Sequence, residues 1–177
     1  MICAMELWDL YDENRLPLGK QIVRGQEKPV AGEYRAVVHV CLFSTDGKML
    51  IQRRQPFKEG WSGKWDVTVG GSAIAGETPK EAAERELKEE LGIALPLPRQ
   101  RLTVNFESGF DDIFLVTRDV ALDSLVLQET EVAEVRWATE TEIIELLHEK
   151  AFIPYHESLI RLLFAMRKHY GTIEEKI

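Results

Sequence analysis

The segment 78–92 constrains the local fold more tightly than any other part of the chain, because it carries both a helix start and a helix stop. Thr78 and Glu81 have the spacing of a capping box, and Pro79 suits the first helical position. Gly92 suits the left-handed residue that ends a helix. We therefore expect a helix that fills this segment and has sharply defined ends.

Two stripes of side chains run along this helix when residues are placed at ~100° each. The apolar stripe, which should face a sheet, consists of Ala83, Leu87 and Leu91. The adjacent stripe is acidic, and it consists of Glu86, Glu89 and Glu90. These residues lie side by side because they are three and four positions apart. Arg85 lies beside Glu81 and Glu89 and is expected to pair with either.

An acidic run on a helix is most often a solvated surface, and that interpretation stays open for this stripe. Like charges at these spacings, however, each cost a helix ~0.2–0.5 kcal/mol, which interleaved lysines would avoid. Three convergent carboxylates offer the hard oxygen ligands that Mg²⁺ and similar cations prefer. The glycines before the helix add backbone groups that a metal or phosphate can approach closely. The pattern therefore indicates a candidate metal site.

Strand patterns occur on both sides of this helix, so the sequence predicts an α/β (α+β) fold with a mixed sheet between helices. The strands are expected over residues 6–11, 16–23, 35–44, 48–53, 65–69, 102–106, 113–116 and 134–137. Gly70 and Gly71 are expected to end a strand and to open a loop that runs to Glu77. A second capping box at Thr139 predicts a helix to about residue 148, and an apolar helix is expected over 155–170.

Composition restricts the class of protein. A chain of 177 residues is most simply one domain, 1–177, and its net charge of −8 disfavours bulk nucleic-acid or membrane-surface binding. No apolar run approaches the ~20 residues of a membrane span, and the first residues lack the pattern of a secretory signal. Two cysteines, Cys3 and Cys41, form no disulfide framework, and Cys41 is expected to be buried. A cytoplasmic location is therefore expected.

The residues from Gly71 to Ile93 read GSAIAGETPKEAAERELKEELGI. They resemble the Nudix box, G-x5-E-x7-R-E-U-x-E-E-x-G-U with U aliphatic, at every defined position. Seven single-identity matches in register have a chance probability of roughly 10⁻⁸ per window at average residue usage. The resemblance implies a Nudix hydrolase domain, with a mixed sheet between helices and the box as a strand–loop–helix unit.

The resemblance also implies roles for individual residues. The metal-binding and base cluster would consist of Glu86, Glu89 and Glu90, with the backbone carbonyl of Gly70 as a further ligand. Arg85 would orient the carboxylates, and Glu77 would brace the loop. Gly71 and Gly92 would have structural roles. The implied cofactor is Mg²⁺ or Mn²⁺.

Some Nudix enzymes use a further carboxylate from a later loop. Candidates are Asp112, Glu131 and Glu134, among which the sequence does not choose. Positive side chains for the phosphates are expected near the strands that form the pocket. These candidates are Arg53, Arg54, Lys58 and Lys64.

Flanking segments narrow the resemblance. Residues 34–36, 52–54 and 61–66 are similar to the Nudix subgroup closest to type I isopentenyl-diphosphate isomerase. The isomerases carry Cys-Gly-His at the strand end where this chain has Val69-Gly70-Gly71, and valine cannot transfer a proton. The sequence therefore favours hydrolysis, with an isomerase-like enzyme and a non-catalytic nucleotide sensor as the alternatives.

The expected function is metal-dependent hydrolysis of a diphosphate bond in a nucleoside diphosphate derivative or similar organic diphosphate. The partner is then a small-molecule diphosphate, and the protein is either a monomer or a homodimer. Nothing in the sequence separates nucleoside di- or triphosphates, nucleotide sugars, dinucleotides and isoprenoid diphosphates.

Overall fold

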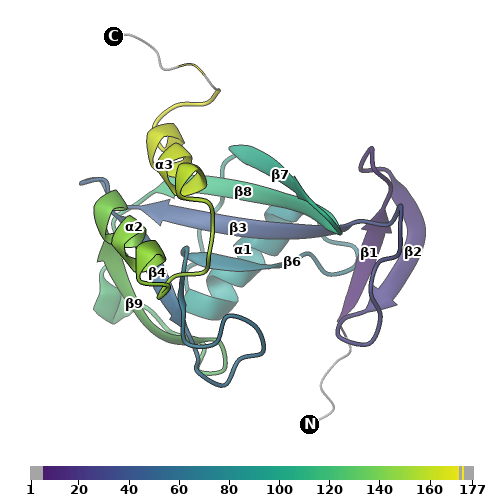
Figure 1. Cartoon of the computed structure of the whole chain (residues 1–177), viewed down its shortest axis with the longest axis horizontal. Helices are drawn as coiled ribbons and strands as arrows, with labels where there is room; N and C mark the ends of the chain where they lie inside the picture. Colours follow the sequence, from purple (N-terminus) through teal and green to yellow (C-terminus); the bar gives the residue numbers. More distant parts are fainter. Residues whose placement is uncertain (1–5, 172, 174–177) are drawn as a thin grey trace.

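The computed structural model describes residues 6–171 and 173, and it contains a mixed sheet with helices on both of its faces (Figure 1). The strands are β1 (Leu7–Tyr11), β2 (Pro17–Val23), β3 (Arg35–Phe43), β4 (Met49–Arg54), β5 (Trp65–Asp66), β6 (Val69–Ser72), β7 (Leu102–Phe106), β8 (Gly109–Thr117) and β9 (Val132–Ala138). The helices are α1 (Pro79–Leu91), α2 (Glu140–His148) and α3 (Glu157–Met166), with a 3₁₀ turn at Leu122–Ser124. The predicted fold class is confirmed.

The central strand β3 pairs in parallel with β8 along its whole length, and β7 continues the sheet beyond β8. On its other side β3 has two antiparallel neighbours. β6 pairs with the first half of β3, whereas β4 meets β3 only at Phe43 and Met49. Because β4 and β6 diverge from the same strand, the sheet splits between them. β4 continues outward into β5 and β9.

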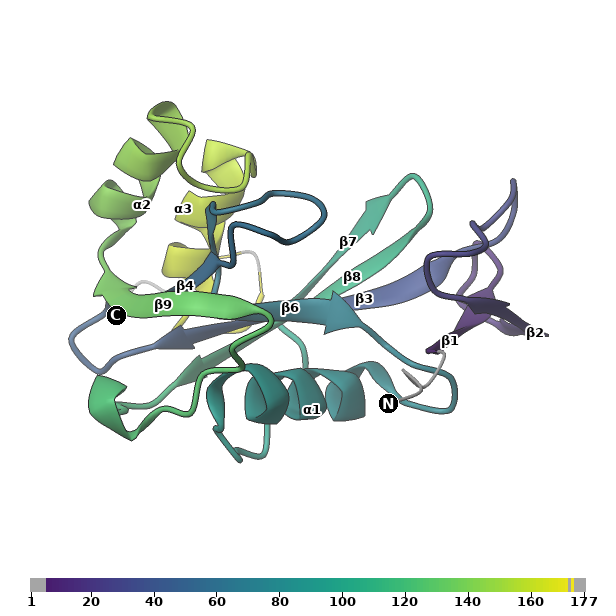
Figure 2. The same cartoon turned by 90° about the horizontal axis from the view of Figure 1, so that it is seen from below.

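Each face of the sheet has its own core. Helix α1 covers one face, and α2 and α3 cover one end of the other face (Figure 2). The α1 face packs Val38, Val40 and Leu42 of β3 against the helix. The opposite face packs Cys41 and Phe43 of β3 against α2 and α3. The strict alternation along β3 follows from the twofold repeat of a strand.

The β1–β2 hairpin lies at the far end of β3 from α2 and α3, as Figure 1 shows. It is joined to β3 by backbone hydrogen bonds in both directions between Tyr11 and Tyr34, at 2.8 and 2.9 Å.

Among the described residues no helix is long and apolar enough to cross a bilayer. Cys41 is fully buried, as expected, and Cys3 lies outside the described residues.

Several predicted boundaries were wrong. The expected strand 65–69 is two strands, because Val67 and Thr68 pass across the split between β4 and β6. Gly70 and Gly71 lie inside β6 rather than opening a loop. The strand predicted over 113–116 begins at residue 109, since its pairing with β3 continues to Arg35. The last helix covers residues 157–166 and is shorter at both ends than expected.

Candidate active site

Helix α1 is held firmly at both ends, and this fixes the direction of its side chains. The capping box predicted at its start is present, with the Thr78 hydroxyl accepting from the Glu81 backbone N–H and the Glu81 carboxylate accepting from Thr78. Gly92 ends the helix at φ 71°, and its N–H bonds the Lys88 carbonyl. The buried side chains of the helix are Ala82, Ala83, Leu87, Glu90 and Leu91.

The three glutamates of the acidic stripe differ in burial. Glu89 is exposed and Glu86 is mostly buried, whereas Glu90 is only 5% exposed beneath the split in the sheet. The Gln52 Nε2 donates to the Glu90 Oε2 at 2.7 Å. Burial, followed by the nearby charge of Glu86, raises the pKa of Glu90 to about 8. Burial also raises the pKa of Glu86, against the opposing effect of Arg85.

Arg85 organises the glutamates around it. Its Nε and Nη2 donate to the two carboxylate oxygens of Glu77 at 2.7 and 3.0 Å, and Nη2 also donates to the Ser72 carbonyl at 3.1 Å. Its Nη1 bridges Glu86 at 2.9 Å and Glu89 at 3.1 Å. The expected alternative pairing with Glu81 was wrong, because the helix cap uses that carboxylate.

Glu77 closes the loop between β6 and α1, since its Oε2 also accepts the Ile74 N–H at 3.0 Å. This contact joins the loop to the guanidinium that holds the stripe. The structure therefore places Glu77 and Arg85 in a single ion-paired unit at the start of the helix.

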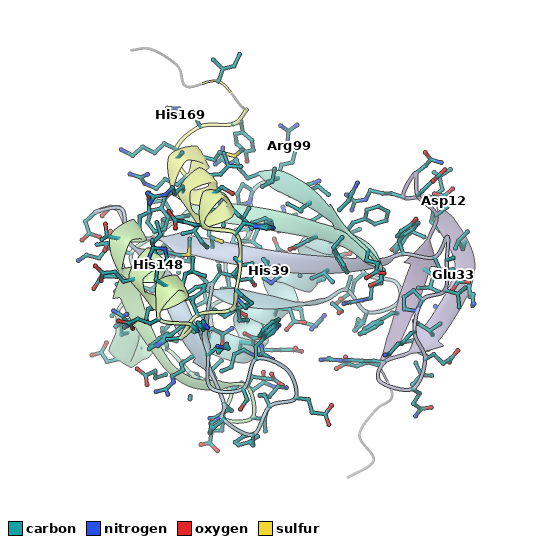
Figure 3. The ribbon with its side chains drawn as sticks, viewed as in Figure 1. Asp12, Glu33, His39, Arg99, His148 and His169 are labelled. Atoms are coloured by element: carbon teal, nitrogen blue, oxygen red, sulfur yellow. The ribbon has the colours of Figure 1, made fainter. Side chains whose placement is uncertain are left out.

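Gly70 and Gly71 let two side chains approach the backbone of β6 from opposite faces. A Cβ on Gly71 would lie 2.0 Å from the Glu86 Oε1, and one on Gly70 would lie 2.5 Å from the His39 Cδ2. His39 is labelled near the centre of Figure 3. Its Nδ1 lies 2.8 Å from the Asp111 Oδ1, and its Nε2 lies 3.2 Å from the Tyr155 hydroxyl oxygen, so both ring nitrogens are held. Burial lowers the pKa of His39, but the Asp111 carboxylate outweighs it and raises this pKa to about 9.

The two glycines are expected to respond differently to substitution. In Gly71→Ala the new methyl group displaces the Glu86 carboxylate, which is the far end of a side chain, so turnover should fall ~10²-fold while stability falls less than in Gly70→Ala. In Gly70→Ala the methyl group meets an imidazole fixed by two partners, so the free energy of unfolding should fall by about 1–3 kcal/mol. Parallel turnover and thermal-melting measurements check both. Equal effects of the two changes on stability would contradict this division.

One cavity of about 120 Å³ brings the box carboxylates together with charged residues from distant segments. Its acidic lining consists of Glu6, Glu86, Glu89, Glu90 and Glu131, and its basic lining consists of Arg24, Arg54, Lys58 and Arg85. Gly70, Gly71 and Gln128 complete the wall. A second cavity of about 480 Å³ shares Arg24, Arg54, Lys58 and Glu131 with the first, so the two are adjacent.

Of the three carboxylates considered outside the box, the structure brings only Glu131 to this cavity. Its Oε1 accepts from the Lys58 Nζ at 2.7 Å. Asp112 is fully buried elsewhere, where Arg15 donates to both of its oxygens at 3.0 and 2.5 Å. Glu134 is exposed and pairs with Arg53 at 3.4 Å.

Two of the four candidate cationic side chains line the cavity, and two do not. Arg54 and Lys58 line the cavity, and the Arg54 Nε is buried with no hydrogen-bond partner among the described residues. Arg53 does not line it, because its Nε donates to the Gly63 carbonyl at 3.0 Å. Lys64 also lies apart and donates to the Lys150 carbonyl.

Three residues of the cavity lining were not predicted from the sequence, Glu6, Arg24 and Gln128, and neither was the contact of Gln52 with Glu90. Arg24, which follows β2 and pairs with Glu6 at 2.6 Å, lies far from the box in the sequence. Gln52 lies on β4, and its amide is the partner of Glu90. No local pattern marks either residue, since both reach the site only through strand pairing.

The donor set consists of hard oxygens, which suits Mg²⁺ or Mn²⁺ better than softer metals. Within residues 6–171 and 173, however, no three His, Cys, Asp or Glu side chains already converge as a metal site. The contacts explain this: Arg85 bridges Glu86 and Glu89, and Gln52 holds Glu90. The residues fit a divalent cation in their chemistry, because Glu86, Glu89 and Glu90 would supply hard oxygen ligands from one cavity wall.

These features define the class of MutT-like hydrolases. The glycines of a mixed sheet face a helix that carries glutamates, and the cavity beside them combines carboxylates with cations. Residues 33–163 match the family described as NUDIX domain. The chain belongs to the Nudix family, and its enzyme class is that of the Nudix pyrophosphohydrolases.

Relatives from several organisms agree with this assignment. The chain is 49% identical over 153 residues to a Nudix hydrolase of Listeria monocytogenes. This alignment covers 85% of this chain and 90% of the Listeria protein. The fold is similar to that of DR0079 from Deinococcus radiodurans, with a TM-score of 0.75 and 25% identity over 89% of this chain and 99% of the other. A MutT protein from Methanosarcina mazei has a TM-score of 0.63 and 25% identity, and the match covers 78% of this chain and 96% of the MutT chain.

Proposed function

We propose that this protein hydrolyses a diphosphate bond in a nucleoside diphosphate derivative or a similar organic diphosphate, with the help of Mg²⁺ or Mn²⁺. The observation that carries the proposal is the single cavity shared by the box glutamates and by Arg54 and Lys58. Carboxylates alone would repel a diphosphate, whereas cations alone would bind it without activating water. Together they supply both requirements of the reaction.

The residues proposed to hold the metal ion are Glu86, Glu89, Glu90 and the carbonyl of Gly70, with Glu131 as the carboxylate from outside the box. When bound there, the ion neutralises charge on the phosphates and increases the electrophilicity of phosphorus. Arg85 keeps its two bonds to Glu77 in this proposal and positions Glu86 and Glu89.

The protein groups then have separate tasks. Arg54 offers a guanidinium whose Nε has no other described partner, and Lys58 adds an ammonium group, so both are proposed to bind phosphate oxygens. Glu86 is proposed as the base that accepts a proton from the attacking water, because its carboxylate lines the cavity and burial raises its pKa. Arg53 and Lys64 lie outside the cavity, so a direct substrate contact from them is not part of the proposal.

The isomerase alternative lacks its proton donor in this cavity. Val69 is fully buried at the position where the isomerases have cysteine, and the described thiol, Cys41, is fully buried on the other face of the sheet. Burial raises the pKa of the Cys41 thiol, so it is a poor acid–base group. The sensor alternative offers no reason to retain all three box glutamates.

A turnover screen tests the proposed reaction. We expect the purified protein with Mg²⁺ or Mn²⁺ to release a phosphate-containing product from at least one nucleoside diphosphate derivative, and we expect EDTA to abolish that release. Isopentenyl diphosphate should not be converted to dimethylallyl diphosphate. Isomerisation at an enzymatic rate would favour the isomerase, and binding of a nucleotide without turnover would favour the sensor.

The carboxylate from outside the box is tested by a matched pair. Glu131→Gln should lower turnover at least ~10-fold, because its carboxylate lines the cavity beside Lys58. Glu134→Gln should leave turnover unchanged, because this exposed side chain pairs with Arg53 and does not line the cavity. Steady-state kinetics of the two variants at saturating Mg²⁺ provide the measurement. Loss of turnover in Glu134→Gln alone would reverse the choice between the two residues.

We also propose a single Nudix domain over residues 1–177 that acts in the cytoplasm as a monomer or a homodimer. The net charge of −8 supports a small-molecule substrate rather than a bulk nucleic acid.

A further inference from the structure

A third cavity, of about 390 Å³, is lined in part by the loop that follows β2. Trp8 of β1, Lys28 of the loop, Arg35 of β3 and Ser108 of the β7–β8 turn contribute to its wall. Its volume is within the range of small-molecule sites. None of the box glutamates lines it, so it is separate from the cavity that holds the box.

Arg35 is the main charged group of this third cavity. Its guanidinium carbon lies 4.6 Å from the centroid of the Trp8 ring and 5.4 Å from that of Phe106, so aromatic rings hold the cation in place. Its Nη1 donates to the Ser72 Oγ at 2.7 Å. Within the described part of the chain, Arg35 forms no ion pair with a carboxylate. The Asp111 carboxylate acts on Arg35 only from beyond ion-pair distance, so the guanidinium is positioned but not paired, as an oxyanion site requires.

Trp8, Lys28 and Glu27 are further residues of the cavity wall. The ring of Trp8 borders the cavity, whereas its indole Nε1 is buried and is not accessible to a ligand. Lys28 is exposed at the rim and pairs with no described carboxylate. The acidic lining residue, Glu27, is turned to its own loop, where its Oε1 accepts the Val23 N–H at 3.4 Å.

We propose that this cavity is a second oxyanion site, which binds the phosphate or carboxylate group of a small molecule through Arg35 and Lys28. The shape of the guanidinium suits two parallel hydrogen bonds to such a group. The ring of Trp8 provides an apolar wall for the adjoining organic part of the ligand.

Ser72 links this site to the box, because its hydroxyl accepts from Arg35 and its carbonyl accepts from Arg85. The oxyanion therefore has two possible sources, the far end of a substrate whose diphosphate lies in the box cavity or a separate anion. Assigning the source rests on the proposed function, whereas the binding site itself does not.

Binding is tested with inorganic phosphate as the probe. The ¹⁵N-labelled protein is titrated in EDTA at constant ionic strength, and the four tryptophan indole N–H resonances are followed, with Trp8 assigned from Trp8→Phe. We expect a saturable shift of the Trp8 resonance. Arg35→Gln should weaken the apparent affinity at least ~10-fold, and Lys28→Gln, at the exposed rim, should weaken it by a smaller factor of about 3.

Arg136→Gln is the matched control, since Arg136 also stacks over a tryptophan, at 5.1 Å from the Trp65 centroid, but does not line the cavity. It should bind phosphate as the parent does. The proposal is overturned if the Trp8 resonance does not respond, or if Arg35→Gln and Lys28→Gln both respond with the parent affinity. Because the titration involves no turnover, its failure is distinct from failure of the proposed reaction.

Kinetics then identify the source of the oxyanion. If the far end of the substrate binds here, Arg35→Gln should raise KM at least ~10-fold only for diphosphates that carry another phosphate or carboxylate group. If a separate anion binds here, added phosphate should change the turnover of simple diphosphates in the parent and in Arg136→Gln, but not in Arg35→Gln. Both results support the oxyanion site. The first identifies the far end of the substrate as its ligand, and the second identifies a separate anion.

Discussion

Replacing Glu90 with glutamine is expected to lower turnover at least ~10²-fold and to raise the melting temperature of the metal-free protein. The change keeps the shape of the side chain, and the new amide oxygen still accepts from the Gln52 Nε2. It removes a carboxyl group that is 5% exposed and whose charged form is disfavoured by burial and by the nearby charge of Glu86. A charge in such a place is costly to the fold without a cation, so its retention indicates a functional demand.

The stability effect should depend on pH. Because the pKa of Glu90 is about 8 in the folded state, against an ordinary value of 4.5, the folded parent binds more protons than the unfolded chain between these values. The stability of the parent therefore falls as pH rises from about 4.5 to 8, and glutamine removes this contribution. Thermal melting in EDTA should show an advantage of Glu90→Gln that grows over this range.

Two further measurements make the Glu90 prediction specific. Titration with Mn²⁺ should show that Glu90→Gln binds the metal more weakly than the parent does. Glu134→Gln, which removes one exposed carboxylate, should match the parent in turnover and in metal affinity. If Glu90→Gln keeps full turnover, the carboxylate stripe is structural and the proposed mechanism fails.

The features that the sequence predicted well are those set by neighbouring residues. The start of α1 depends on Thr78, Pro79 and Glu81, and its end depends on Gly92. At each end the contacts span about one turn of the helix. The common face of the three box glutamates likewise follows from helical spacing alone. Strand β3 was predicted because its alternating apolar residues serve two separate cores.

The features that were missed depend on which strands meet. Gly70 and Gly71 have the composition of a loop, but pairing with His39 and Val38 of β3 makes them part of a strand. The choice of Glu131 over Asp112 depends on distant contacts, since Asp112 on β8 is paired with Arg15 and Glu131 lies beside Lys58 in the cavity. Glu90 is buried because β4, carrying Gln52, lies against it. These relations join residues far apart in the chain, where local patterns carry little information.

Replacing Arg85 with alanine is expected to reduce both stability and turnover, unlike the Glu90 change. Arg85 donates five hydrogen bonds, two of them to Glu77 and two that bridge Glu86 and Glu89. Its loss leaves the mostly buried Glu77 and Glu86 carboxylates without a counter-charge. We expect the free energy of unfolding to fall by about 2–4 kcal/mol, which corresponds to roughly 5–15 °C in melting temperature.

A matched control separates this arrangement from an ordinary surface ion pair. Arg161 also contacts two glutamates, Glu157 at 2.7 Å and Glu140 at 2.9 Å, but it is 54% exposed on α3. Arg161→Ala should therefore cost at most about 0.5–1 kcal/mol and leave turnover intact.

Arg85→Lys tests whether charge alone is sufficient. A single ammonium group cannot bond both oxygens of Glu77 and also bridge Glu86 and Glu89, so lysine should recover little of the lost turnover. Positioning by Arg85 predicts that kcat falls ~10²-fold in both variants at temperatures well below their melting points. If Arg85→Ala melts with the parent and turns over at the parent rate, the ion-paired unit of Glu77 and Arg85 does not hold the glutamates in place. The carboxylates would then be positioned by the helix caps and by Gln52 alone.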